Sequence, residues 1–449
     1  MTDPTLQNRY EHDLQLHTGQ FLQGDYQTPS DKSISHRALI FGAIASGPTV
    51  IENILDSQDV QTTQLALQQL GVNITTAGKT TTVQGQAGCK FAKPQSALDF
   101  GNSGTTARLF LGLLARQSFS IQIQGDASLS QRPMARVVLP LTTMGMQSRY
   151  LAKSGYLPLS ILPSSTIHGI HYQMPMASAQ LKSALILAAL QADSPTEIEQ
   201  PAVSRDHTER MLRQFGGGDS LQVHGLKLLV SPLQHPLQAQ HVVVPGDPSS
   251  AAFLITAALL LPQSRLVVKN QSLNETRTGF LQIIHQLAPT AVTIGSQSAQ
   301  NQGEPAGDIC IHSVTNRLAA FRIDAHNLGS LIDEIPILSL LATQCAGTTV
   351  IRDATELRYK ETDRLSVIAT ELTQLGANIT EQPDGLQIIG PTKLHASVTT
   401  ADSHKDHRIA MMLVIAAVII GDRFPIKGLN SIAISNPTFM DDLISLLKD

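Results

Sequence analysis

One structural pattern recurs six times along the sequence, and this repetition constrains the fold more than any other feature. Each copy begins with a helix of small apolar residues, continues with a short strand and an amphipathic helix, and adds β-branched strands. The intervals of about 70 to 84 residues predict six copies of an α/β unit of roughly 75 residues. The apolar helices are predicted to begin near Ser33, Ser103, Gln180, Ser249, Asp333 and Asp406, and several amphipathic helices to end at a C′ glycine: Gly71, Gly145, Gly216 and Gly376.

The repeats favour two domains of three copies each, because about 75 residues per copy is long for a continuous solenoid. The segment His241–Asp247, which contains a proline and a glycine, separates the third copy from the fourth. The sixth copy ends in its amphipathic helix with no strands after it, and strands before Pro29 could complete it. We therefore predict a discontinuous domain (1–28 plus 246–449) and an inserted domain (29–245), joined by two strands, with an active-site cleft between them.

The composition is that of a globular protein with an aliphatic, alanine-rich core. Of the 449 residues 42% are hydrophobic and 15% charged, whereas aromatic residues make up only 4% and tryptophan is absent. The net charge of −4 disfavours a dedicated nucleic-acid binder, and the scarcity of aromatic residues argues against a base-stacking platform. We therefore expect no nucleic-acid partner.

The cysteines indicate a reducing compartment. Cys89, Cys310 and Cys345 are odd in number, far apart and without CxxC spacing, which disfavours a disulfide framework or a structural zinc site. The first residues carry acids and lack the apolar stretch of a secretory signal. The longest apolar runs, Ile409–Ile420 and Ala251–Leu261, are too short to span a bilayer. We expect a cytoplasmic protein without a membrane partner.

Pro29–Gly47 has the pattern of a helix whose first turn binds an anion. Free backbone N–H groups and the positive end of the helix dipole favour a phosphate there, and Lys32, Ser33 and Arg37 would add charge and donors. A capped core helix with two solvated cations explains this stretch equally well when it is considered alone. The repetition of the pattern shifts the balance towards anion binding.

Cations recur near the starts of the repeats, where helix N-termini are also expected. For any single cation a solvated surface position is the more common outcome, but together they predict a ligand with several negative charges. The stretch Gly101–Leu109 (GNSGTTARL) adds a possible anion nest that matches neither the Walker loop nor the dinucleotide fingerprint. The cations are Lys32, Arg37, Arg108, Arg132, Arg136, Lys182, Arg205, Lys360, Arg364 and Arg408.

Two stretches carry acids that indicate chemistry. Asp333 lies in LIDEIP between apolar residues, where a carboxylate is costly unless it has a partner or a function. In ELRYKETDRL, a helix would place Lys360 and Arg364 on one face with Glu361 beside them. A carboxylate among cations stays ionised, and partial burial can prepare it for proton transfer. A salt-bridged surface helix is the alternative.

No metal is expected. The histidines nearest these motifs, His36, His207 and His407, have no metal-ligand spacing and form no Ser/His/Asp elbow, so we interpret them as capping or packing residues.

The motifs together resemble one family. In chain order they are DKSISHRAL, GNSGTTARL, GDASLSQRPM, SAQLKSALILA, PGDPSSAAF, DEIPIL, ELRYKETDRL and DHRIAM, and they cover the chain from about Pro29 onward. They resemble 5-enolpyruvylshikimate-3-phosphate synthases of the second common sequence type. The resemblance implies an α/β fold, a two-domain inside-out α/β barrel of six βαβαββ repeats with three in each domain. It also implies a monomer without a cofactor.

The family transfers the enolpyruvyl group of phosphoenolpyruvate to the 5-hydroxyl of shikimate 3-phosphate and releases phosphate. The resemblance assigns catalysis to Asp333 as the base near that hydroxyl and to Glu361 as the proton donor to the methylene carbon, with Lys32 sharing the proton transfers. For shikimate 3-phosphate the implied ligands are Lys32, Ser33, Arg37, Ser178, Ala179, Gln180, Arg205, Asp333 and Lys360. For phosphoenolpyruvate they are Lys32, Gly104, Arg132, Gln180, Arg364 and Arg408.

The sequence departs from the family pattern at two places. Ser30 stands where the family usually has glycine, and Ile434 and Ser435 occupy a region where some members place a lysine. Three alternatives fit the sequence less well. UDP-N-acetylglucosamine enolpyruvyl transferases typically carry a reactive cysteine in a loop that here reads QRPMAR and has none. RNA 3′-phosphate cyclases need nucleotide chemistry and a basic RNA surface, and neither is apparent in this sequence. A non-catalytic anion-binding protein would not need Lys32, Asp333 and Glu361 together.

Overall fold

The computed structural model describes residues 4–295, 303–396 and 399–449. Their contacts divide the chain into two compact units. Unit 1 contains residues 4–29, 246–295, 305–396 and 399–449, whereas unit 2 contains residues 30–245 with Gly303 and Glu304. Within the described residues, no helix is both long and apolar enough to cross a membrane.

Unit 2 contains three sheets of four strands that share one topology. In each sheet the first two strands are parallel and the remaining pairs are antiparallel, in the orders β13-β2-β4-β3, β5-β6-β8-β7 and β9-β10-β12-β11. The strands are β2 (Ser46–Glu52), β3 (Asn73–Ala77), β4 (Thr80–Gln86), β5 (Leu98–Asp99), β6 (Ile121–Gln124), β7 (Ser148–Tyr150), β8 (Leu159–Ile161), β9 (His171–Gln173), β10 (Thr196–Glu199), β11 (Leu221–His224), β12 (Lys227–Val230) and β13 (His241–Val243). The helices are α2 (Lys32–Ile44), α3 (Gln58–Gln69), α4 (Gly104–Leu113), α5 (Ala135–Thr143), α6 (Ala179–Ala189) and α7 (His207–Gln214), with 3-10 turns at Leu129–Gln131 and Gly218–Ser220.

Unit 1 repeats the same topology with changes at its ends. Its sheets have the orders β15-β16-β14-β1-β23, β17-β18-β20-β19 and β21-β22. The strands are β1 (Phe21–Gln27), β14 (Arg265–Ser272), β15 (Val292–Ile294), β16 (Ala306–His312), β17 (Arg322–Ile323), β18 (Gly347–Ile351), β19 (Asn378–Gln382), β20 (Gly385–Gly390), β21 (Ala401–Asp402), β22 (Ile426–Lys427) and β23 (Leu447–Lys448). The helices are α1 (Pro4–Asn8), α8 (Pro248–Leu260), α9 (Gly279–Leu287), α10 (Ile335–Ala342), α11 (Arg364–Gln374), α12 (His407–Ile420) and α13 (Phe439–Leu446), with a π turn at Arg9–Asp13 and 3-10 turns at Leu328–Ser330, Ile332–Glu334, Thr355–Tyr359 and Leu429–Ile434.

The first strands of two repeats are exchanged between the units. β1 precedes α2 in the chain, yet it pairs in parallel with β14 of unit 1. β13 precedes α8, yet it pairs in parallel with β2 of unit 2. The chain therefore passes from one unit to the other after each of these strands, between residues 29 and 30 and between residues 245 and 246.

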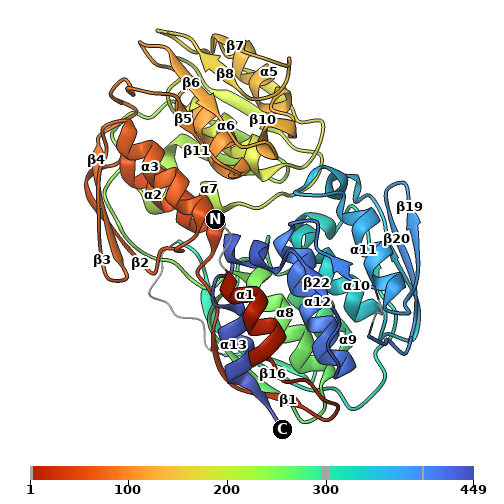
Figure 1. Ribbon diagram of the computed structural model, residues 1–449. Helices are drawn as coiled ribbons and strands as arrows, with labels where there is room; N and C mark the ends of the chain where they lie inside the picture. Colours follow the sequence, from red (N-terminus) through yellow and green to blue (C-terminus); the bar gives the residue numbers. More distant parts are fainter. Residues whose placement is uncertain (1–3, 296–302, 397–398) are drawn as a thin grey trace. The chain divides into compact units, whose positions relative to one another are not determined.

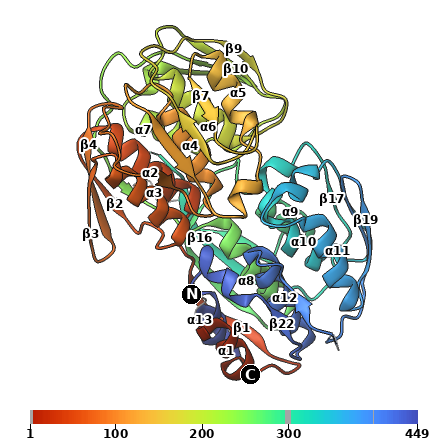
Figure 2. The ribbon, with the colours of Figure 1, turned by 45° about the horizontal axis from the view of Figure 1, so that its top comes forward.

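The end of the chain corrects one prediction. The sequence led us to expect no strand after the last amphipathic helix, but the two-residue strand β23 follows α13 directly. It pairs antiparallel with the start of β1, through Phe21↔Lys448 and Leu22↔Leu447. Before Pro29 the described residues contain one strand, β1, rather than several. Figure 2 shows α1, β1 and α13 beside one another at one end of unit 1.

The alanine-rich helices form the hydrophobic cores of the two units, as the six apolar helices of the sequence pattern predict. Helices α2, α4 and α6 of unit 2 and α8, α10 and α12 of unit 1 are buried around most of their circumference. In unit 1, α8 and α12 pack side by side (Figures 1 and 2). Small side chains permit this close packing, and the sheets then cover helices that would otherwise expose apolar surface. The observed helices begin within two residues of the predicted positions.

Candidate active site

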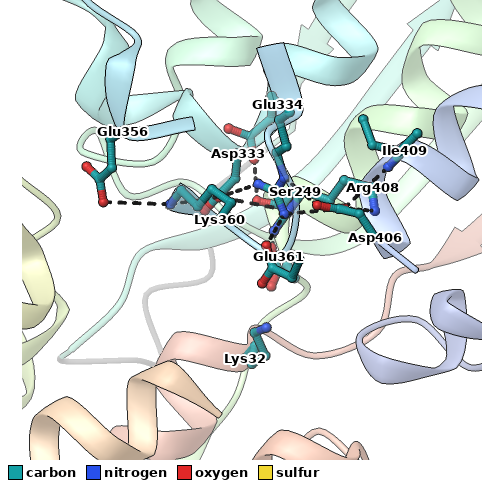
Figure 3. A network of polar contacts seen from close by, with 12 residues as sticks. Lys32, Ser249, Asp333, Glu334, Glu356, Lys360, Glu361, Asp406, Arg408 and Ile409 are labelled. Atoms are coloured by element: carbon teal, nitrogen blue, oxygen red, sulfur yellow. Dashed lines mark hydrogen bonds and ion pairs between the residues drawn. The ribbon is translucent and has the colours of Figure 1, made fainter. Parts of the chain in front are cut away.

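Three cations approach the carboxylate of Asp333 in unit 1 (Figure 3). Asp333 lies in the 3-10 turn before α10, and its Oδ1 atom is 3.6 Å from Lys360 Nζ, 3.4 Å from Arg364 Nη1 and 3.9 Å from Arg408 Nε. The side chain of Asp333 is 15% exposed, so a small molecule can reach it. The cations stabilise the ionised carboxylate, which can then accept a proton.

Arg364 is the centre of this cluster. Its side chain is 1% exposed and donates to Glu361 Oε2 at 2.7 Å and to Asp406 Oδ2 at 2.8 Å. Burial alone would lower the pKa of Arg364, but the carboxylates of Asp406, Glu361 and Asp333 raise it above its ordinary value. The guanidinium therefore remains a fixed positive charge over the whole working pH range.

Asp406 is a residue that the sequence reasoning missed as part of the site. It is fully buried, and its Oδ1 accepts a hydrogen bond from the backbone N–H of Arg408 at 2.9 Å, which caps α12. The same carboxylate orients Arg364 through Nε. An aspartate immediately before a predicted helix was the available signal, because such residues commonly act as N-caps.

The stretch from Glu356 to Leu365 is not one helix, which corrects the expectation that Lys360 and Arg364 share a helical face. A 3-10 turn ends at Tyr359, and α11 begins at Arg364, with Asp363 capping it through Ser366 N at 3.2 Å. Because the chain breaks here, Lys360 and Arg364 meet at Asp333 from two separate elements.

In unit 2, Lys32 lies in the first turn of α2 and contacts an acid from the neighbouring helix. Its Nζ is 3.0 Å from Oδ2 of Asp59 in α3, and the two side chains are 20% and 12% exposed. Asp31 caps the same helix by accepting from Ile34 N at 2.9 Å. No local pattern predicts Asp59 as a partner of Lys32, because 27 residues separate the two.

Two arginines and a glutamine converge at the start of α4. Arg132 Nη2 donates to Asn102 Oδ1 at 2.7 Å, and Arg108 Nη1 donates to Gln180 Oε1 at 2.9 Å. A Cβ atom on Gly104 would lie 2.7 Å from Arg108 Nη1 and 3.6 Å from Arg132 Nη1. Only glycine therefore fits between these guanidinium groups without displacing them, and the helix N-terminus and the arginines together favour an anion.

Two of the predicted cations are engaged in buried bonds within unit 2. Arg37 donates to Thr208 Oγ1 at 2.7 Å and to Ser183 Oγ at 2.8 Å, and burial lowers its pKa to about 10, so it stays charged at neutral pH. Lys182 is 1% exposed and pairs with Glu209 Oε1 at 2.6 Å. Lys182 thus has an acidic partner inside the unit, and its place among the ligand-facing cations stays a prediction.

The remaining predicted ligands lie at loops and helix starts of unit 2. Ser178 caps α6 by accepting from Leu181 N at 3.4 Å, and Ala179 is the first residue of that helix. Ser33 lies in the first turn of α2, and Arg205 lies in the partly exposed link before α7. Arg136, near the start of α5, contacts Met176 Sδ at 3.6 Å.

The predicted packing histidines are buried. His36 bonds Thr63 Oγ1 at 2.7 Å, and His207 bonds Glu304 Oε1 at 2.7 Å. Within the described ranges, no group of three or more His, Cys, Asp or Glu side chains is arranged to hold a metal ion.

Solved structures with this arrangement define the class of protein. An EPSP synthase from Acinetobacter baumannii matches with a TM-score of 0.84 and 35% identity, covering 97% of this chain and 99% of that one. The enolpyruvyl transferase NikO from Streptomyces tendae matches with a TM-score of 0.76 at 18% identity, over 96% and 97% of the two chains. The fold is thus the two-domain inside-out α/β fold of the enolpyruvyl transferases.

The sequence comparisons specify the family. The sequence profile for EPSP synthase (3-phosphoshikimate 1-carboxyvinyltransferase) matches residues 16–443. A 3-phosphoshikimate 1-carboxyvinyltransferase from Enterococcus faecalis is 45% identical over 432 residues, which cover 96% of this chain and 99% of that protein. The chain belongs to the EPSP synthase family, and it is an enzyme of the transferase class. A UDP-N-acetylglucosamine enolpyruvyl transferase is not favoured.

Proposed function

We propose that this chain transfers the enolpyruvyl group of phosphoenolpyruvate to the 5-hydroxyl of shikimate 3-phosphate. The products are 5-enolpyruvylshikimate 3-phosphate and inorganic phosphate, on the route to chorismate and the aromatic amino acids. The reaction is an addition followed by an elimination. The hydroxyl oxygen adds to C2 of phosphoenolpyruvate while C3 gains a proton, and the tetrahedral intermediate then loses phosphate and a proton from C3.

The acids of unit 1 supply the proton transfers in this proposal. Asp333 accepts the proton of the 5-hydroxyl, and its ionised form is stabilised by the cations that approach Oδ1. Glu361 donates the proton to C3 in the addition and takes one back in the elimination. Its side chain is 22% exposed and is held by Arg364, so it has a defined orientation and access to a ligand. Lys32 of unit 2 shares these transfers.

The cations bind the anionic groups of the substrates. Arg364 and Arg408 of unit 1, together with Arg132, Gln180 and the N-terminus of α4 at Gly104, hold the phosphate and carboxylate of phosphoenolpyruvate. Shikimate 3-phosphate is bound by a second set of residues, which consists of helix starts and charged side chains. These ligands are Lys32, Ser33, Arg37, Ser178, Ala179, Gln180, Arg205, Asp333 and Lys360.

One observation carries the proposal: an accessible carboxylate with three cations on a single oxygen atom, next to a second carboxylate on one of those cations. A protein that only binds anions gains nothing from Asp333 and Glu361, because both acids repel the ligand. A role in proton transfer explains why both acids are present. The non-catalytic alternative is therefore weaker than the enzymatic one.

The test is phosphate release by the purified protein with both substrates present. We expect turnover that requires phosphoenolpyruvate and shikimate 3-phosphate together, with no release when either is omitted. Release with UDP-N-acetylglucosamine as the acceptor would support the alternative transferase. Binding of shikimate 3-phosphate without any phosphate release would support the anion-binding alternative and refute this proposal.

We further propose that the enzyme works in the cytoplasm as a monomer on these small molecules. The cysteines are unpaired, and burial raises the pKa values of Cys89 and Cys345 to about 12, so these thiols stay protonated. Light scattering during gel filtration tests the oligomeric state, for which a mass near 48.3 kDa is expected.

A further inference from the structure

A second group of charges is buried beside the turn that carries Asp333. Glu334, the next residue, is fully buried, and Arg277 and Ser249 are 2% and 1% exposed. Asp333 faces Lys360, Arg364 and Arg408, whereas Glu334 faces Ser249 and Arg277. The two neighbouring acids of one turn therefore have different partners, as Figure 3 shows for Ser249, Glu334 and Asp333.

The buried group connects the start of α8 to the turn. Arg277 Nη2 donates to Asp247 Oδ1 at 2.9 Å and to Ser249 Oγ at 3.0 Å, and Arg277 Nη1 is 3.9 Å from Glu334 Oε1. Ser249 Oγ in turn donates to Glu334 Oε1. Asp247 also caps α8 through Ser249 N at 2.8 Å. These hydrogen bonds and ion pairs connect α8, a helix of 13 residues, to the three-residue turn that carries Asp333 and Glu334.

Such a group is not needed for stability alone. Apolar side chains of similar volume fill a core at least as well as buried charges, whose desolvation offsets their attraction. The three-residue turn at Ile332–Glu334 leads directly into α10, and Glu334 N donates to Leu331 O at 2.9 Å. Three cations contact Asp333 as well, and a side-chain anchor at Glu334 would keep the turn in a fixed orientation against their attraction.

We propose that Glu334, Ser249 and Arg277 are positioning residues that hold the turn so that the Asp333 carboxylate stays in place for proton transfer. They act through the turn and do not touch substrate. The inference rests on the proposed function, in which Asp333 is the base. A displacement of about 1 Å at a reacting group can cost roughly 100-fold in rate, so loss of the anchor should affect turnover before it affects binding.

The first test is Ser249→Ala, with Ser339→Ala as its matched control. Ser339 is an equally buried serine in α10, and its hydroxyl donates to Ile335 O within its own helix. We expect Ser249→Ala to lower kcat about 10-fold or more while the Kd of shikimate 3-phosphate changes by less than about threefold. Ser339→Ala should retain the wild-type kcat. Phosphate release at saturating substrates, calorimetric binding and thermal unfolding give the three readouts.

The second test distinguishes two roles of Glu334: accepting a hydrogen bond from Ser249 and transferring a proton. Glu334→Gln keeps an acceptor oxygen for Ser249, whereas Glu334→Ala removes it, so positioning predicts a kcat for the glutamine variant several-fold above that of the alanine variant. A kcat in Ser249→Ala equal to that in Ser339→Ala would overturn the proposal. Equal losses in kcat, binding and thermal midpoint would overturn it as well, since they indicate general unfolding. Failure of the wild type to turn over would instead refute the proposed function.

Discussion

At Glu361, a single substitution separates a chemical role from a structural one. Glu361→Gln keeps the size of the side chain and an oxygen that can accept from Arg364, but it removes the carboxyl group that can take up and donate a proton. We expect kcat to fall about 100-fold or more, in line with the usual contribution of a general acid, while the Kd of shikimate 3-phosphate changes by less than about threefold. Phosphate release and calorimetry measure the two quantities.

A matched control for this variant is Glu381→Gln, since Glu381 also accepts from an arginine, Arg358, at 2.7 Å, on the surface of β19. It should leave both kcat and the Kd unchanged. If Glu361→Gln weakened binding as much as turnover, Glu361 would belong to the structure of the cluster rather than to the chemistry.

His36 makes the stability of the enzyme depend on pH. Burial lowers its pKa from 6.5 to about 3, so the folded chain keeps this histidine neutral in mild acid while the unfolded chain protonates it. The contribution is complete above pH 6.5 and is lost as the pH falls towards 3. Between pH 7 and 5 the loss is about 2 kcal/mol.

Urea unfolding at pH 7 and pH 5 measures this contribution. His36→Gln should lose about 2 kcal/mol less between the two pH values than the wild type does. His235→Gln, at an exposed loop position, is the control and should follow the wild type. Identical pH dependence in all three proteins would show that His36 is not the group responsible.

At the scale of elements, the close contact between α4 and α6 depends on Gly112. A Cβ atom there would lie 2.0 Å from the carbonyl oxygen of Ala184, which is backbone and cannot rotate away. We expect Gly112→Ala to lower the free energy of unfolding by about 1–3 kcal/mol through overpacking. Gly218→Ala is the control, since its Cβ would meet Arg213 Cγ at an ordinary 3.6 Å. Equal midpoints in urea for the two variants would contradict the prediction.

Local signals allowed the elements to be predicted, because helix caps and stop glycines act over a few residues. The four stop glycines have positive φ angles between 82° and 109°, as C′ positions require: Gly71, Gly145, Gly216 and Gly376. Charge partners were not predictable in this way. Lys182 pairs with Glu209 of another helix, and Lys360 contacts Asp333 of a separate turn. Such pairings are set by tertiary packing, which no short stretch of sequence records.

For the whole molecule, the exchange of β1 and β13 makes the two units unequal as independent folding units. The buried core of unit 2 consists of residues between Ile34 and Val244, all within one continuous stretch of chain. The core of unit 1 includes Leu22 and Tyr26 from β1, which lies between β14 and β23 in its five-stranded sheet. A cut after residue 245 therefore leaves one core complete and the other without an interior strand.

We expect residues 30–245, expressed alone, to fold cooperatively, because their core, their three sheets and β13 are all present. Residues 246–449 alone should not, since without β1 the edges of β14 and β23 would lack their shared partner and expose buried backbone groups. Thermal unfolding followed by circular dichroism compares the two fragments. Addition of residues 4–29 as a separate peptide should restore a cooperative transition in the second fragment. If the second fragment folded as well as the first, β1 would be a peripheral strand and the exchange would have no energetic consequence.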